Sequence, residues 1–219
     1  MPLTFDPAAA VAHLKKRDRD LGAIIRDAGP FTLSPPRGVS PFESLLRAIV
    51  SQQLSGKAAA TILGRVHALF ESTKKRDPEA LLALSTESLR AAGLSGNKVL
   101  AVRDLAAKTI DGTVPTMRKL RTMSDEEVVE RLVQVRGIGV WSAEMLLMFS
   151  LGRPDVLPVA DLGVRQGFMF TYALEAMPTV AALTEHAEKW RPYRSVASWY
   201  MWRAVELSRR DKAAKSAVK

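Results

Sequence analysis

Apolar residues recur along much of the chain at the three- and four-residue spacing that amphipathic helices require. After the segment Ser124–Glu127, which has the composition of a helix capping box, Val128, Leu132 and Val135 follow at positions i, i+4 and i+7. No segment alternates apolar and polar residues over the length of a strand with hairpin turns between. The pattern therefore predicts an all-α protein with few or no strands.

Residues that favour helix ends mark the boundaries of this pattern. Ser40-Pro41 supplies an N-cap and a first-turn proline for a helix through Phe42–Ser51, and Asp77-Pro78 repeats the same arrangement before a shorter helix. Gly93 and Gly112 fall where helices are expected to end.

Composition narrows the classes of protein that fit. The 219 residues are 47% hydrophobic and 25% charged, which is typical of a globular chain and excludes disorder as the main state. The absence of cysteine excludes a disulfide scaffold, a zinc site with Cys ligands, an iron–sulfur cluster and a thiol nucleophile. Charge-free stretches reach only about nine residues, too short to cross a bilayer, and no signal peptide pattern is present. We expect a soluble, intracellular protein of the cytoplasm.

The balance of charge indicates a polyanionic partner. Thirty-two Lys and Arg against 23 Asp and Glu give a net charge of +9. An excess of this size favours nucleic acid as the partner, with a basic but merely solvated surface as the alternative.

Residues 132–152, LVQVRGIGVWSAEMLLMFSLG, hold the most informative motif. The capped helix ends here, Gly137-Ile138-Gly139 forms a tight turn, and a second helix begins at about Val140. Glycine permits backbone conformations closed to other residues, and its small size lets turn amides approach a phosphate. Ile138 is expected to anchor the turn in the core. By itself, this motif also fits an ordinary connection between two helices.

A second motif, LPVADLGVRQG at residues 157–167, places Asp161 after an extended apolar approach. The aspartate is expected to be the N-cap of a third helix, and capping alone is the simpler interpretation of its presence.

Taken together, the two motifs resemble the helix–hairpin–helix DNA glycosylases. The resemblance is closest to the 3-methyladenine DNA glycosylase II branch of alkylation repair. It extends to Trp190–Ser195, WRPYRS, and to Phe42–Ser55, FESLLRAIVSQQLS, so that it covers most of the chain.

The resemblance implies an architecture and a function. We expect two helical subdomains with a cleft between them: a central one, residues 41–153, that contains the hairpin, and a discontinuous one, residues 1–40 plus 154–219. The expected activity is hydrolysis of the N-glycosidic bond of 3-methyladenine and similar methylated purines after base flipping, in base excision repair. The expected partner is double-stranded DNA with damaged bases, bound by a monomer.

The resemblance also implies roles for individual residues, each at the position that matches the family. Asp161 matches the catalytic aspartate. Trp141 and Trp202 match aromatic residues of the base pocket. Met145 stands at a pocket position where close relatives can have an aromatic residue, and it equally fits core packing. The hairpin residues that match those binding a DNA phosphate are Gly137, Ile138 and Gly139. Gln53 and Leu54 match the plug that fills the gap left by the flipped nucleotide. The backbone carbonyls of Val133, Val135 and Gly137 match those that hold a monovalent cation.

Departures from the family pattern limit the chemistry. Arg136 stands where much of the superfamily has proline. Trp141 occupies the position of the lysine that bifunctional relatives use to attack the sugar, so we expect no lyase activity. No cofactor is expected for the chemistry, only a structural Na⁺ or K⁺ at the hairpin. The alternatives are a non-catalytic hairpin module that binds DNA, and a glycosylase/lyase for oxidised bases. The Asp161 motif argues against the first, and Trp141 argues against the second.

Overall fold

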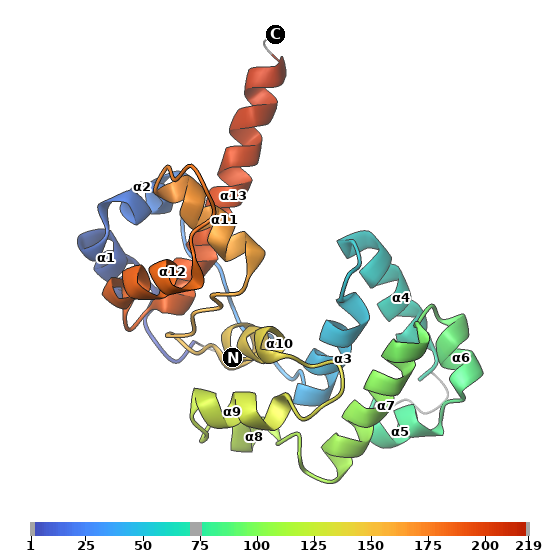
Figure 1. The fold of residues 1–219 in the computed structure, drawn as a ribbon. Coiled ribbons are helices and arrows are strands. Elements are labelled where there is room, and N and C mark those ends of the chain that lie inside the picture. Colours follow the sequence, from blue (N-terminus) through green and yellow to red (C-terminus); the bar gives the residue numbers. More distant parts are fainter. Residues whose placement is uncertain (1–2, 71–75, 218–219) are drawn as a thin grey trace. The chain divides into compact units, whose positions relative to one another are not determined.

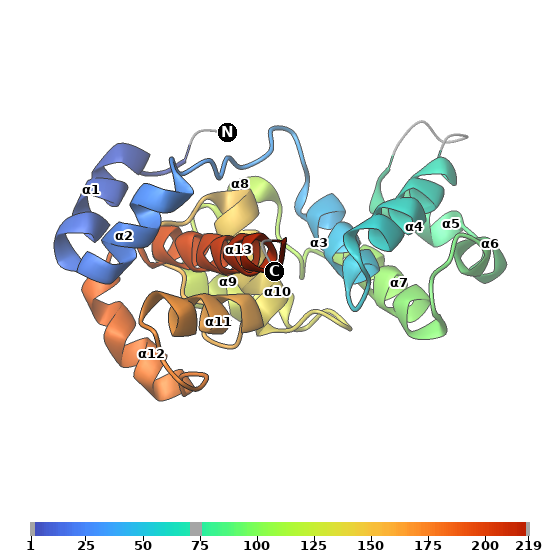
Figure 2. The ribbon, with the colours of Figure 1, turned by 90° about the horizontal axis from the view of Figure 1, so that it is seen from above.

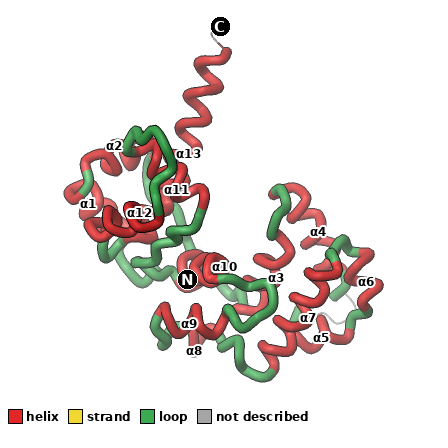
Figure 3. The backbone as a smooth tube through the Cα atoms, in the orientation of Figure 1, coloured by secondary structure: helices red, strands yellow, loops and turns green. Residues whose placement is uncertain are grey.

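A computed structural model describes residues 3–70 and 76–217, and every regular element in these residues is a helix (Figure 3). The prediction of an all-α fold is confirmed. The chain forms two compact units: a central unit, Pro36–Leu151, and a discontinuous unit of Met1–Pro35 with Gly152–Lys219. The sequence placed the divisions after residues 40 and 153, and the structure places them after residues 35 and 151.

The central unit consists of eight α-helices and one π-helical turn within its described residues (Figure 1). They are α3 (Pro41–Ser51), α4 (Gly56–Ala68), α5 (Pro78–Ala83), α6 (Thr86–Ala91), α7 (Gly96–Ile110), α8 (Met117–Leu120), α9 (Asp125–Leu132), α10 (Val140–Leu146) and the π-helical turn Leu147–Leu151. α7 packs against both α3 and α5.

The predicted caps are present. Ser40 accepts a hydrogen bond from the backbone of Glu43 at 3.1 Å, and Asp77 caps α5 through the amide of Ala80. At α9 the reciprocal capping box is complete: Ser124 Oγ accepts from the Glu127 amide, and the Glu127 carboxylate accepts from the Ser124 amide. Since each bond joins residues three apart, local sequence is enough to set where these helices begin.

The discontinuous unit contains α1 (Pro7–Arg17), α2 (Arg19–Ala28), α11 (Leu162–Thr171), α12 (Val180–Ala187), a 3₁₀ turn (Glu188–Trp190) and α13 (Arg194–Ala217). Figure 1 shows α13 extending beyond the other helices of its unit, and Figure 2 shows the same helix close to end-on. The core gathers residues far apart in sequence, among them Leu14, Phe168, Trp190 and Tyr200. Trp190 and Trp199 are core residues.

A close crossing of α11 and α13 organises this unit. A Cβ at Gly167 would lie 2.0 Å from the carbonyl oxygen of Met201, so only glycine fits at this point. The approach of the two backbones brings residues of α13 next to the start of α11, which is where Asp161 lies.

One buried carboxylate joins several segments of the discontinuous unit. Asp18 is 2% exposed and accepts hydrogen bonds from the Leu21 amide, the Tyr172 hydroxyl and the Trp190 indole, with His186 Nε2 at 3.3 Å and Lys189 Nζ at 3.1 Å. Burial alone would raise the pKa of Asp18, but the hydrogen bonds outweigh it and hold the pKa well below its usual range.

None of the helices in the described part of the chain combines the length and the apolar character needed to span a membrane.

Candidate active site

The turn between α9 and α10 has the geometry that its glycines predict. Gly137 adopts a φ of +79°, a region that favours glycine, and a Cβ there would approach the Cβ of Ala101 in α7 to 3.3 Å. Ile138 is 4% exposed, so it anchors the turn in the core as expected. Gly139 is extended and begins α10 without a side-chain cap, and nothing lies within 4 Å of the place where its Cβ would be.

Side chains of helix α7 bind the backbone of this turn through hydrogen bonds. The carboxylate of Asp104 accepts a hydrogen bond of 2.7 Å from the Arg136 amide, and Lys108 donates to the carbonyl of Gln134 as well as to Asp104. Burial would raise the pKa of Asp104, but these hydrogen bonds keep it below its ordinary value. The turn is therefore fixed by side chains about thirty residues away, which the local sequence does not reveal.

A cavity of about 740 Å³ opens beside the hairpin within the central unit. Trp141 and Met145, both predicted for the base pocket, line it together with Phe149. The three residues are four apart, so they follow one face of the continuous helical run formed by α10 and the π-helical turn. The opposite side is lined by Ser44, Leu45, Arg47, Ala48, Ser51, Gln52 and Gln53.

Phe149 was missed by the sequence analysis, although its spacing from Trp141 and Met145 was a usable signal. It is 38% exposed and Trp141 is 44% exposed, so both side chains leave part of their apolar surface outside the core. A π-helical turn at Leu147–Leu151 carries Phe149, and such turns are frequent at functional sites.

The predicted plug is a short connection between α3 and α4. Gln53 has a φ of +58°, in the left-handed region that residues with a Cβ seldom adopt. Leu54 follows it and is 37% exposed. Gln53 also lines the cavity that contains Trp141, so the plug and part of the predicted pocket lie together.

Asp161 is the N-cap of α11, as the sequence predicted, and it has a further partner. Its Oδ1 accepts a hydrogen bond of 2.8 Å from the Val164 amide and one of 2.9 Å from Nε1 of Trp202. Gly163 makes room for this contact, because a Cβ there would lie 2.7 Å from Cδ1 of Trp202 and 3.1 Å from Oδ1 of Asp161. The structure thus joins Asp161 to Trp202, which the resemblance placed in the base pocket and which is not among the residues lining the cavity beside the hairpin.

The WRPYRS segment holds the loop that leads to Asp161. Arg191 and Arg194 both bind the carboxylate of Asp155, at 2.6 and 2.8 Å. Ser195 donates its amide to the carbonyl of Pro154 and accepts from the Val156 amide. Because the loop is fixed at three successive residues, this segment orients the approach to Asp161.

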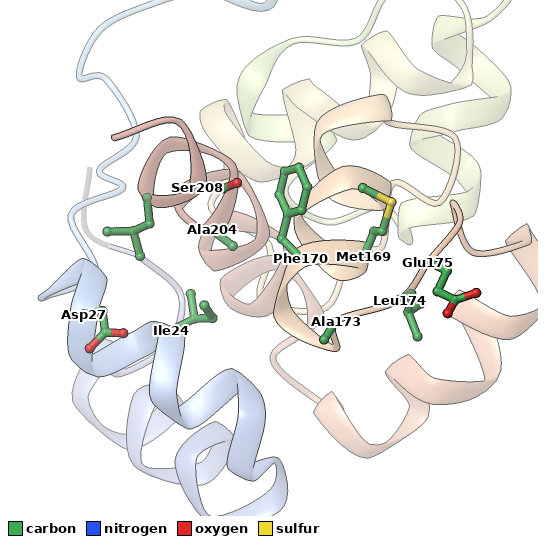
Figure 4. Close-up of a pocket in the computed structure, with 10 residues that line it drawn as sticks. Ile24, Asp27, Met169, Phe170, Ala173, Leu174, Glu175, Ala204 and Ser208 are labelled. Atoms are coloured by element: carbon green, nitrogen blue, oxygen red, sulfur yellow. The ribbon is translucent and has the colours of Figure 1, made fainter. Parts of the chain in front are cut away.

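A second cavity, of about 690 Å³, lies in the discontinuous unit between α2, α11 and α13 (Figure 4). Ile24, Met169, Phe170 and Leu207 give it an apolar lining, and Asp27 and Glu175 are its charged residues. None of the predicted site residues lines it, and its two carboxylates do not suit a polyanionic ligand.

Comparisons with known proteins agree with these features. Residues 46–192 match the family model described as the HhH-GPD superfamily of base excision DNA repair proteins. DNA-3-methyladenine glycosylase 1 of Schizosaccharomyces pombe is 36% identical over 202 residues, which cover 91% of this chain and 88% of that protein. DNA-3-methyladenine glycosylase 2 of Escherichia coli is 28% identical over 176 residues, 76% of this chain and 58% of that protein.

Solved structures share the fold. The structure of S. pombe 3-methyladenine DNA glycosylase (Mag1) in complex with abasic DNA has a TM-score of 0.79 at 36% identity and covers 89% of this chain and 95% of that one. A DNA-3-methyladenine glycosidase from Bacillus halodurans has a TM-score of 0.80 at 37% identity, with 93% of this chain and 91% of that one covered.

Proposed function

The chain belongs to the HhH-GPD superfamily of base excision DNA repair proteins, and on that premise we propose how its own residues remove an alkylated base from DNA. It is a DNA glycosylase of the alkylation-repair type, which hydrolyses the bond between the base and the sugar. The substrates we assign to it are 3-methyladenine and similar methylated purines in double-stranded DNA, and we assign the activity to a monomer.

Asp161 supplies the negative charge that the reaction needs. As the bond to the base breaks, the sugar becomes positively charged, and a carboxylate held close to it stabilises that charge far better than water does. The two hydrogen bonds on Oδ1 orient the carboxyl group before substrate arrives. The same carboxylate can orient or deprotonate the attacking water. This double anchoring of Asp161 is the observation that carries the proposal.

The cavity beside the hairpin is the site we assign to the flipped base. Trp141 and Phe149 line it with aromatic side chains, and an alkylated purine carries positive charge. Each aromatic face attracts such a cation by roughly 0.5–2 kcal/mol. Since the charged base is already a good leaving group, no strong general acid is required, and the aromatic lining favours methylated bases over neutral ones.

The hairpin turn and the plug account for DNA binding. We assign a backbone phosphate to the amides at Gly137–Gly139, where the open space at Gly139 allows close approach. This contact is independent of base sequence, and the net charge of +9 strengthens it. Gln53 and Leu54 fill the gap left by the extruded nucleotide, which costs a few kcal/mol to create.

A monovalent cation at the hairpin is a further part of the proposal. The carbonyl of Gly137 accepts a hydrogen bond from Nε2 of Gln52 at 2.8 Å, and that of Val135 accepts one from the Ile138 amide. Each carbonyl oxygen retains a second lone pair, so Val133, Val135 and Gly137 fit Na⁺ or K⁺ through the lone pairs that remain. When bound, the ion would add positive charge near the phosphate. No chemical step depends on it.

Replacing Asp161 with Asn tests the function. Asn caps helices about as well as Asp and keeps an oxygen for both hydrogen bonds, while the charge is lost. We expect release of free methylated base from alkylated duplex DNA to fall at least about 100-fold, with thermal unfolding unchanged and DNA binding equal or tighter. Full activity in D161N would contradict the proposed mechanism.

The same assay tests the absence of lyase chemistry. With Trp141 in place of a lysine, the wild-type protein should leave an intact abasic strand, and borohydride should trap no covalent complex. A trapped adduct would overturn the assignment as a monofunctional glycosylase.

A further inference from the structure

The loop that carries the plug is held by a partly buried lysine. Nζ of Lys98, in the first turn of α7, donates hydrogen bonds to the carbonyls of Val50 at 2.7 Å and Gln52 at 2.8 Å. Both carbonyls lie at the C-terminal end of α3, where helical partners are lacking and the helix dipole is negative. Partial burial lowers the pKa of Lys98.

A second contact joins the same loop to the hairpin. Nε2 of Gln52 donates to the carbonyl of Gly137 at 2.8 Å, across 85 residues of sequence. Gln52 is therefore held at both ends: its backbone carbonyl binds Lys98, and its side chain binds the turn that we assign to a DNA phosphate.

One face of α7 makes all of these connections. Lys98 reaches the plug loop, Ala101 lies under Gly137, and Asp104 and Lys108 bind the backbone of the hairpin turn. The four positions are separated by three, three and four residues, which is the spacing of a single helical face. A rigid helix thus sets the distance between the plug and the hairpin.

The backbone conformation of Gln53 in the plug needs neighbouring contacts to stabilise it. Gln53 has a φ of +58°, which is costly for a residue with a Cβ and persists where neighbouring contacts enforce it. The contacts on either side of Gln53 are the hydrogen bonds of Gln52 and the backbone bond from the Leu54 amide to the Ser51 carbonyl.

We propose that Lys98 and Gln52 are positioning residues for base extrusion: they hold Gln53 and Leu54 in the inserting conformation, at a fixed distance from the hairpin, before DNA binds. This inference rests on the proposed function and extends it to Lys98, which does not line the base cavity, and to Gln52, which lines it and also binds the hairpin. Preorganising the loop removes the cost of ordering it during insertion. The benefit arises only where a duplex must be opened.

The test compares excision from duplex and single-stranded DNA, both carrying the same methylated purine, under single-turnover conditions. Lys98→Met keeps the length of the side chain and removes its hydrogen bonds. We expect the duplex rate to fall about 10-fold or more, because a charge-assisted contact is lost, while the single-strand rate stays within about twofold. Equal losses on both substrates, or no loss, would overturn the inference.

Two matched variants separate positioning from charge. Lys98→Arg keeps a donor and a positive charge and should recover most of the duplex rate. Lys57→Met removes the same charge from an exposed residue of α4, so any loss should be shared by both substrates. A duplex-specific loss in K57M equal to that in K98M would show that net charge, not position, is responsible.

Gln52→Ala provides an independent variant should K98M fail to fold, because it removes the side-chain bond to Gly137. Gln52 also lines the base cavity, so a change in the pocket would lower both rates, whereas a loss of positioning lowers the duplex rate alone. Its duplex rate should fall selectively, as in K98M. A second readout needs no chemistry: 2-aminopurine opposite an abasic-site analogue brightens when the plug unstacks it. We expect wild type and K98R to raise this fluorescence at saturating protein, and K98M and Q52A to raise it much less.

The fluorescence measurement also keeps this inference distinct from the proposed function. If the wild-type protein unstacks the reporter, K98M and Q52A unstack it much less, and no methylated base is released, the proposed function fails and the positioning role stands. If base release is normal and the reporter responds equally to wild type, K98M and Q52A, the positioning role fails and the function stands.

Discussion

The carboxylate of Asp161 shows how much of the site depends on single atoms. Its Oδ1 accepts from the Val164 amide within its own helix and from Nε1 of Trp202 in α13, 41 residues later. The first bond caps α11 and would exist in any protein with this local sequence. The second ties the acid to another helix, so Trp202 orients the group that we hold responsible for the chemistry.

Replacing Trp202 with Phe removes the N–H donor and keeps an aromatic side chain. We expect the single-turnover rate of base release to fall about 10-fold, since one hydrogen bond to a charged group is lost, with DNA affinity nearly unchanged. Trp199→Phe is the matched control, because Trp199 is a buried residue of the same helix. It should lower thermal stability and leave the rate intact. A W202F protein as active as wild type would argue against this role.

Among the elements, the hairpin turn contrasts two glycines that look equivalent in sequence. Gly137 has a positive φ and lies against Ala101, so it needs to be glycine for the fold. Gly139 is extended and has open space at its Cβ position, so a side chain there should not disturb the fold. Its role is therefore best tested by charge.

Gly139→Asp should weaken binding to any duplex, whereas Gly139→Asn should weaken it much less. Both side chains cap a helix about equally well, so the difference reports repulsion between a carboxylate and the phosphate. The wild-type affinity should fall steeply with salt, and this can be followed by fluorescence anisotropy from low to high ionic strength. Binding that is indifferent to salt would contradict the assignment.

The crossing of α11 and α13 is the second element whose geometry depends on one residue. A Cβ at Gly167 would lie 2.0 Å from the Met201 carbonyl oxygen, and a backbone atom cannot turn aside as a side chain does. We expect Gly167→Ala to lower the free energy of unfolding by about 3 kcal/mol or more. Gly64→Ala, at an exposed position of α4 with nothing near its Cβ, should instead raise it by about 0.5–1 kcal/mol. Urea unfolding compares the two.

For the molecule as a whole, acid stability should depend on Asp18. Its pKa is lower in the folded protein than the ordinary value of 3.8, so the unfolded chain takes up a proton first as the pH falls. The contribution of this carboxylate is therefore complete above the unfolded pKa and is lost as the pH falls through the folded one.

In the wild-type protein, the midpoint temperature of thermal unfolding should consequently fall as the pH is lowered below about 4. Asp18→Asn lacks the carboxylate charge, so its midpoint temperature should be lower than that of the wild type at neutral pH. Because Asn does not titrate, this midpoint should also change less as the pH falls. Parallel profiles for the two proteins would show that Asp18 does not govern acid stability.

The sequence by itself determined the helical fold, most helix starts and the hairpin. Each of four predicted caps binds the amide three residues further along the chain, so local hydrogen bonding was sufficient to place the helix starts. These caps are Ser40, Asp77, Ser124 and Asp161. The turn at Gly137–Gly139 and the buried Ile138 followed from the same short-range rules.

Only the tertiary structure decided which distant side chains meet. Four hydrogen bonds join residues that are 41 to 172 positions apart in the sequence. They link Trp202 to Asp161, Gln52 to Gly137, Lys98 to Val50 at the end of α3, and Trp190 to Asp18. No periodicity encodes such pairs, because each depends on how whole helices pack against one another. Phe149 shows the same limit, since its spacing was visible in the sequence but its exposure to the cavity was set by packing and by the π-helical turn.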